Sequence, residues 1–209
     1  MANQCDTSIV FYSENKRMVE DLWQNITDFC NGNHDCTIYK FMQKMGYSKN
    51  DLHIFDKRGA ITHCDSSVTY SDSIAYFKIE TISAWMPRVD EFYKLIDEHY
   101  DSEISIVFEA EEFGCGLYYN TDIEGRFFKD RYKVDYRLHK DIVKYFERFS
   151  DVIGYLKKIF PKAKISQFDD INTIEEKVQS AYDIGKDNER FFNLNRFEYE
   201  YPFKKKDML

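Results

Sequence analysis

The clearest pattern along this chain of 209 residues is an alternation of short apolar runs with longer segments whose apolar residues lie three or four positions apart. Runs rich in β-branched and aromatic residues predict strands at 8–12, 60–65, 73–82 and 104–109. Helical spacing predicts helices at 16–30, with Ser13 as the N-cap, at 36–46 and at 88–100. The polar segment 47–59 is expected to be irregular. Both faces of 73–82 are mostly apolar, which predicts a central position in a sheet.

The second half of the chain continues with a glycine turn at 114–116, followed by a strand at 117–120. We expect 126–136 to pair with that strand in an antiparallel hairpin. From Leu138 to Phe160, apolar residues follow four-three spacing, which predicts one long amphipathic helix ended by Pro161. The remaining elements are predicted as a strand at 163–168, a helix at 173–182 with Asn172 as its N-cap, and a strand at 191–201.

This order of elements defines the expected fold class. The order strand, helix, two strands, helix and strand is typical of the split βαβ arrangement. Adjacent strands joined by short turns favour an antiparallel or mixed sheet over a doubly wound parallel one. We therefore predict an α+β fold, with a ferredoxin-like sandwich over residues 6–136 and a C-terminal α/β extension over 137–209 that packs on it.

Charge is unevenly distributed along the chain, whose formal net charge is −8. Residues 80–124 hold 12 acidic and 2 basic side chains, whereas residues 125–164 hold 12 basic and 5 acidic ones. Such segments can be solvated faces that partly neutralise each other. They can also form a bipolar surface suited to a charged partner.

The sequence also bears on the compartment. The chain has five cysteines, an odd number that does not suit a disulfide framework. No apolar run approaches the roughly 18 residues that a membrane span needs, and residues 1–10 lack the pattern of a signal peptide. We therefore expect a cytoplasmic protein with reduced thiols.

The middle of the chain resembles a known family. A strand ending in Thr81 leads to Trp85-Met86-Pro87, then to a helix, then to a strand ending in the acidic run 109–112, and then to Gly114-Cys115-Gly116. Over residues 74–119 this pattern is similar to the YubB ferredoxin-like domain family, found in proteins of plasmids, phages and other mobile elements. The resemblance implies a ferredoxin-like fold and a mobile-element context, and it implies no catalytic residues.

Soft metal ligands occur close together in CNGNHDC. Cys30, His34 and Cys36 would need a fourth ligand to bind zinc, for which the His63-Cys64 pair is the best candidate. The spacing matches no zinc signature, so a buried cysteine at a helix end beside a polar turn is the favoured interpretation.

Two further chemistries have candidate residues. Glu109, Glu111 and Glu112 with Asp65 could converge to bind Mg²⁺ in a metal-dependent hydrolase. On a strand, however, Glu112 would point away from the other two glutamates. Sheet aromatics could instead stack bases, as in RNA-recognition domains; the candidates are Tyr76, Tyr118, Tyr119, Phe127 and Tyr132. The acidic segment would repel phosphates, which favours a core role for these rings.

The preferred hypothesis is a non-catalytic module that binds another protein with a basic surface, without any cofactor or metal. It would act through an acidic surface, and it could inhibit a host nucleic-acid-handling or defence protein. Its candidate contact residues are Trp85, Glu109, Glu111 and Glu112. The alternative is a protein that binds or processes nucleic acid through a basic stretch at 126–164; its candidate residues are Lys129, Arg131, Lys133, Arg137, Lys140 and Lys144. A metal-dependent hydrolase is the third hypothesis.

Overall fold

The computed structural model describes residues 3–32, 34–48, 58–114, 116–184 and 190–201. The chain forms two compact units: unit 1 comprises Met1–Thr121 with Glu200–Leu209, and unit 2 comprises Asp122–Tyr199. The division at residue 121 precedes the boundary predicted at 136, because the strand that begins at Tyr132 belongs to the sheet of unit 2.

In its described residues, unit 1 is an α+β unit with three helices over a six-stranded antiparallel sheet. Its elements are β1 (Gln4–Ser13), α1 (Lys16–Gly32), α2 (Ile38–Lys44), β2 (Gly59–Cys64), β3 (Thr69–Ser71), β4 (Ile74–Ala84), α3 (Asp90–His99), β5 (Ser105–Glu112) and β6 (Leu117–Asn120). The strand order is β2-β4-β1-β5-β6, with β3 also paired to β4. The predicted central position of 73–82 is confirmed, because β4 lies between β2 and β1.

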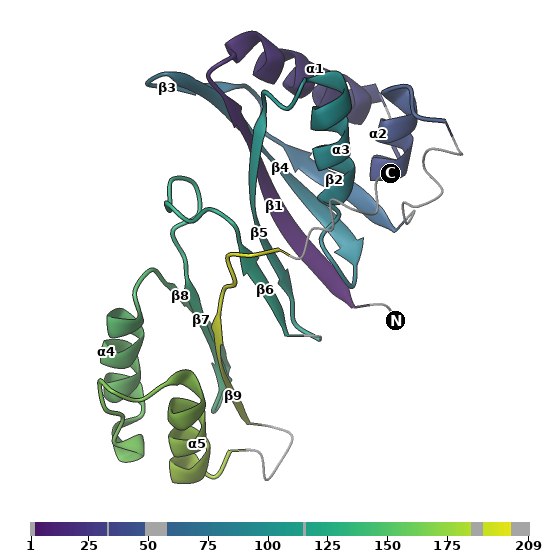
Figure 1. Cartoon of the computed structure of the whole chain (residues 1–209). Helices are drawn as coiled ribbons and strands as arrows, with labels where there is room; N and C mark the ends of the chain where they lie inside the picture. Colours follow the sequence, from purple (N-terminus) through teal and green to yellow (C-terminus); the bar gives the residue numbers. More distant parts are fainter. Residues whose placement is uncertain (1–2, 33, 49–57, 115, 185–189, 202–209) are drawn as a thin grey trace. The chain divides into compact units, whose positions relative to one another are not determined.

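The helices of unit 1 gather on one face of this sheet (Figure 1). The buried face of α1 consists of Val19, Leu22, Ile26 and Phe29, the residues that helical spacing predicted. They belong to one core with the alternate strand residues Ile9, Phe11, Phe77, Ile79, Ile106 and Phe108. The rings of Phe11 and Phe77 stack at 5.1 Å, so the two central strands are joined by aromatic packing as well as by hydrogen bonds.

The starts of α1 and α2 involve side-chain hydrogen bonds. Ser13 was predicted to cap α1, but the helix begins at Lys16; the Ser13 hydroxyl instead accepts from the Asn15 amide and donates to the Glu103 carbonyl. In α2 the side chain of Thr37 accepts from the Lys40 amide and so acts as the N-cap. Most of the predicted irregular segment 47–59 lies outside the described residues.

The described part of unit 2 packs two α-helices on a three-stranded antiparallel sheet of order β8-β7-β9. Its elements are β7 (Tyr132–Arg137), β8 (Asp141–Phe146), α4 (Phe149–Ile159), the 3₁₀ helix η1 (Pro161–Ala163), α5 (Ile171–Tyr182) and β9 (Phe191–Arg196). Its core combines strand residues such as Val134 and Leu194 with Leu156 of α4 and Val178 of α5. Figure 1 shows α4 and α5 next to this small sheet.

Two predictions in this region, one strand pairing and one helix, were wrong. Strand β6 pairs with β5, and not with the segment that follows it, whereas β7 pairs with β8 and β9. The predicted long helix is divided into strand β8 and helix α4. Ile142 and Phe146 explain the error, because residues four positions apart share a face in a strand as well as in a helix.

The last elements agree with prediction only in part. Helix α4 ends before Pro161, and α5 is capped by the side chain of Asp170, which accepts from the Thr173 amide, rather than by Asn172. The predicted strand at 163–168 does not form: Ala163 ends η1, and Lys164 takes a left-handed conformation with φ of 49°. Among the described residues, no helix has the length and apolar character needed to cross a membrane.

Candidate functional site

The predicted acidic contact residues lie mainly on the sheet face of unit 1 opposite the helices. Strand alternation places Phe108 and Ala110 in the core and directs Glu109 and Glu111 to the other face. Glu109 is directly opposite Ser8 on β1, and Glu111 is directly opposite Asp6. On the other side of β1, Ser8 is also opposite Glu80 of β4. We call the four carboxylates Asp6, Glu80, Glu109 and Glu111 the acidic face.

Three carboxylates of the acidic face have polar partners within unit 1. Lys78 Nζ lies 3.1 Å from Glu80 Oε1, and the Asn120 amide donates to Glu109 Oε2 at 3.3 Å. Asp6 accepts from the Gln4 amide at 2.8 Å. Asp6 and Glu111 are like charges directly opposite each other in an antiparallel ladder, an arrangement that destabilises a sheet. The register of β1 and β5 therefore places two like charges side by side at this surface.

The acidic character belongs to unit 1 as a whole. Unit 1 holds 22 acidic and 13 basic residues, a net charge of −9, whereas unit 2 holds 15 acidic and 16 basic residues, a net charge of +1. The basic segment found in the sequence is thus largely neutralised within its own unit. The negative charge of the chain originates in unit 1.

Glu112 and Trp85 have different environments from the other predicted contact residues. Glu112 is 1% exposed, and its carboxylate accepts from the Gly114 amide at 2.9 Å, so it serves the β5–β6 turn. Trp85 is 42% exposed just after β4, with φ of 72°, and its amide donates to the Asn3 carbonyl. Glu112 is therefore not part of the acidic face, whereas Trp85 is available at the surface.

A second exposed aromatic residue lies at the same end of the sheet. Phe113 is 53% exposed, directly follows β5, and packs its ring edge-to-face on Tyr118 at 6.3 Å. Tyr118 is opposite Glu111 in the ladder between β5 and β6. Sequence reasoning missed Asp6, Glu80 and Phe113, because only the strand register shows that they adjoin Glu109 and Glu111.

The six basic candidates are not equivalent. Arg131 is buried and its guanidinium donates to the carbonyl of Asp122; Lys133 is fully buried with its ammonium 5.4 Å from the centre of the Tyr145 ring. Arg137 forms an ion pair with Asp141. The remaining three side chains are exposed: Lys129, Lys140 and Lys144. Three of the six cations are thus engaged in contacts within unit 2.

The aromatic candidates for base stacking do not form one platform. Tyr76 and Tyr118 occupy the same sheet face as the acidic face, whereas Tyr119 packs edge-to-face on Tyr201. Phe127 and Tyr132 belong to unit 2. The rings that the sequence grouped together are therefore distributed over different surfaces.

The three candidate metal-binding thiols, Cys30, Cys36 and Cys64, lie near one another in unit 1. The Cys36 thiol donates to the Cys30 carbonyl at 3.7 Å, and Cys64 Sγ lies 3.7 Å from Thr27 Oγ1. Burial and the neighbouring thiols raise the pKa of Cys30 to about 12, which disfavours the thiolate that metals require. In the part of the chain that the structure describes, no three His, Cys, Asp or Glu side chains are grouped so that they could hold a metal ion.

Comparison of the chain with protein-family models, with curated proteins and with solved structures finds no match.

Proposed function

We propose that this chain is a non-catalytic cytoplasmic module of a mobile element, and that its acidic face binds a basic surface of another protein. The observation that carries this proposal is the pair formed by Asp6 and Glu111, two carboxylates directly opposite each other. Like charges in this position lower the stability of the sheet. A basic partner would turn that repulsion into an attractive contact at the same positions.

Exposed aromatic residues beside the acidic face support a protein partner. Trp85 and Phe113 follow directly after strands β4 and β5, at the end of the sheet where β1 begins. Interfaces between proteins are enriched in aromatic side chains, which bury a large area at a low cost in conformational entropy. Carboxylates with adjacent aromatic rings fit a basic protein surface better than they fit a phosphate backbone.

The finer fold assignment and the biological context belong to the same proposal. We propose a ferredoxin-like core in unit 1, supported by the order β2-β4-β1-β5 and by the positions of α1 and α3 in the chain. The mobile-element context rests on the resemblance of residues 74–119 to the YubB family. A module of this kind would inhibit a host nucleic-acid-handling or defence protein by presenting carboxylates where phosphates normally bind.

Nucleic-acid binding through unit 2 remains the second candidate. The exposed cations Lys129, Lys140 and Lys144 favour it, but the net charge of unit 2 is only +1. If this function holds, affinity for oligonucleotides should decrease steeply with added salt. Absence of oligonucleotide binding at low salt would exclude it.

Co-purification from host lysate distinguishes the two functions. The tagged protein, a Glu109→Lys/Glu111→Lys variant and a Glu98→Lys/Asp101→Lys control would be compared with and without nuclease treatment. The control residues are exposed at and just after the end of α3. We expect a nuclease-resistant protein partner that the first variant loses and the control retains. Partners lost on nuclease treatment, or retained equally by both variants, would contradict the proposal.

A further inference from the structure

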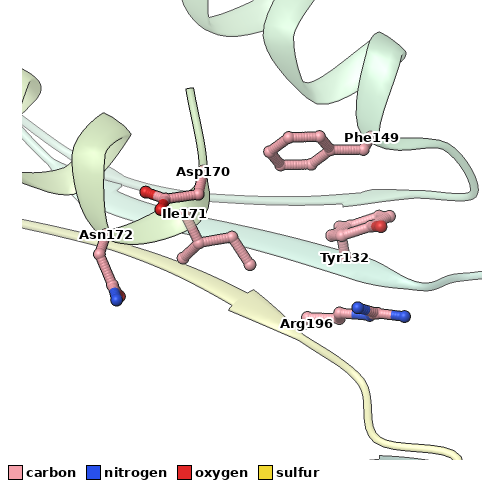
Figure 2. A pocket seen from close by; sticks show the side chains of 6 residues that line it. All are labelled: Tyr132, Phe149, Asp170, Ile171, Asn172 and Arg196. Atoms are coloured by element: carbon pink, nitrogen blue, oxygen red, sulfur yellow. The ribbon is translucent and has the colours of Figure 1, made fainter. Parts of the chain in front are cut away.

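Unit 2 contains a pocket that the sequence did not reveal. Its volume is about 470 Å³, and it is lined by Tyr132, Phe149, Asp170, Ile171, Asn172 and Arg196. This volume lies within the range of about 300–1,000 Å³ that is usual for small-molecule sites. Figure 2 shows the first residues of α4 and α5 meeting the ends of β7 and β9 around this space.

The walls of the pocket are suited to a planar apolar group. The rings of Tyr132 and Phe149 lie 5.2 Å apart at an interplanar angle of 39°, and both are only partly buried. Ile171, also partly buried, lines the pocket with them. Aromatic rings favour offset stacking with a further ring at similar distances. The pocket thus offers aromatic and aliphatic surface to a ring of the size of benzene.

Arg196 supplies a positive charge at this aromatic wall. It is directly opposite Tyr132 in the ladder between β7 and β9, and its side chain extends below the Tyr132 ring in Figure 2. Its guanidinium lies 5.9 Å from the centre of the Tyr199 ring. No ion pair to Arg196 occurs among the residues that the structure describes. This guanidinium can therefore bind the carboxylate of a ligand.

Asp170, the acidic residue of the lining, is engaged in capping helix α5. Its carboxylate accepts from the Thr173 amide at 2.7 Å as the N-cap of α5. Hydrogen bonds from Thr173, first from its side chain and second from its backbone amide, lower the pKa of Asp170. Thr173 thus stabilises the charge of Asp170, while Arg196 has no acidic partner in the described part of unit 2.

We propose that this pocket binds a small planar aromatic carboxylate, with its ring against Tyr132 and Phe149 and its carboxylate on Arg196. The site lies wholly within unit 2 and does not depend on the acidic face. A planar guanidinium binds a carboxylate through two parallel hydrogen bonds, which explains why an arginine suits this position.

Titration of the full-length protein with benzoate, followed by amide NMR, tests this assignment. Benzamide serves as the neutral ligand of the same shape. We expect millimolar binding of benzoate, shifts centred on residues 132, 149, 171 and 196, and affinity about tenfold weaker for benzamide.

Two arginine variants make the test specific. Arg196→Gln should weaken benzoate binding about tenfold, because it removes a charge-assisted contact. Arg126→Gln is the control: Arg126 is also exposed in unit 2, also contacts one aromatic ring, and does not line the pocket. The fold of each variant is verified by its amide spectrum.

A lysine variant separates the effect of the positive charge from that of the planar guanidinium. Arg196→Lys retains the charge without the planar fork and should bind benzoate with intermediate affinity. The proposal is overturned if benzoate does not bind at about 10 mM, if benzamide binds as tightly as benzoate, or if Arg126→Gln weakens binding as much as Arg196→Gln.

Discussion

Asp6 on β1 and Glu111 on β5 are directly opposite each other in an antiparallel ladder, on the sheet face opposite the helices of unit 1. Both sit beside residues that the fold requires: Cys5 and Ala110 are buried in the core. The alternation that buries these neighbours directs the two carboxylates to the other face. The core pattern thus determines where the repulsive pair lies, although it does not require acidic residues there.

Removing one of these two charges should stabilise unit 1. We expect Asp6→Asn to raise the free energy of unfolding by about 0.2–1 kcal/mol at low ionic strength, because the repulsion from Glu111 is lost. The gain should decrease with added salt, which screens exposed charges. Chemical denaturation at two salt concentrations measures it, with Glu14→Gln as a control at another exposed acidic residue. A loss of stability at low salt would refute the electrostatic interpretation of the pair.

Asp90 should make the stability of unit 1 dependent on pH. Burial raises the pKa of this carboxyl above its ordinary value of 3.8, and the positive charge of Arg88 offsets only part of the increase. A carboxyl whose pKa is raised in the folded state contributes stability at pH values below its unfolded pKa, and that contribution is lost as pH rises through the folded pKa. Asp90→Asn should therefore increase stability at pH 7.

The pH profile provides the direct test of the Asp90 prediction. The free energies of unfolding of wild type and Asp90→Asn should be closest at acid pH and should diverge as pH rises through the raised pKa. Denaturation curves between pH 3 and pH 7, roughly the range over which aspartates titrate, would measure this difference. A stability difference that is constant over that range would show that ionisation of Asp90 is not its cause.

Asp122 should be a structural residue of unit 2. It is 4% exposed, and its carboxylate accepts from the amides of Phe127 and Phe128 at 2.6 and 2.9 Å. Asp122→Ala would leave these two donors without the carboxylate and should cost about 2–4 kcal/mol. Hydrogen exchange at the two amides measures the effect, and Glu124→Ala, at an exposed neighbour, is the control. Unchanged protection of both amides would contradict this role.

The periodicity of apolar residues predicted unit 1 well. The buried stripe of α1, the central position of β4 and the opposite orientation of Glu111 and Glu112 all follow from local spacing, because burial in each case repeats with the period of the element. Neighbourhood across strands could not be predicted in this way. Asp6 is far from Glu111 in sequence, and only the register of the sheet brings them together.

In unit 2 the spacing of apolar residues was ambiguous. Ile142 and Phe146 satisfy both helical and strand spacing, so their pattern could not distinguish β8 from an extension of α4. The pocket could not be predicted either, because Tyr132, Phe149 and Arg196 come from three separate elements. The basic stretch was visible in sequence, but the burial of Arg131 and Lys133 depends on tertiary packing.

The most direct test of the acidic face is the affinity for the purified partner obtained by co-purification. Wild type would be compared with Glu109→Gln/Glu111→Gln and with Glu98→Gln/Asp101→Asn, which removes the same number of charges near the end of α3. We predict about tenfold weaker binding for the first variant, greatest at low salt, and wild-type affinity for the second. Equal affinities of all three proteins would contradict the claim that this face binds the partner.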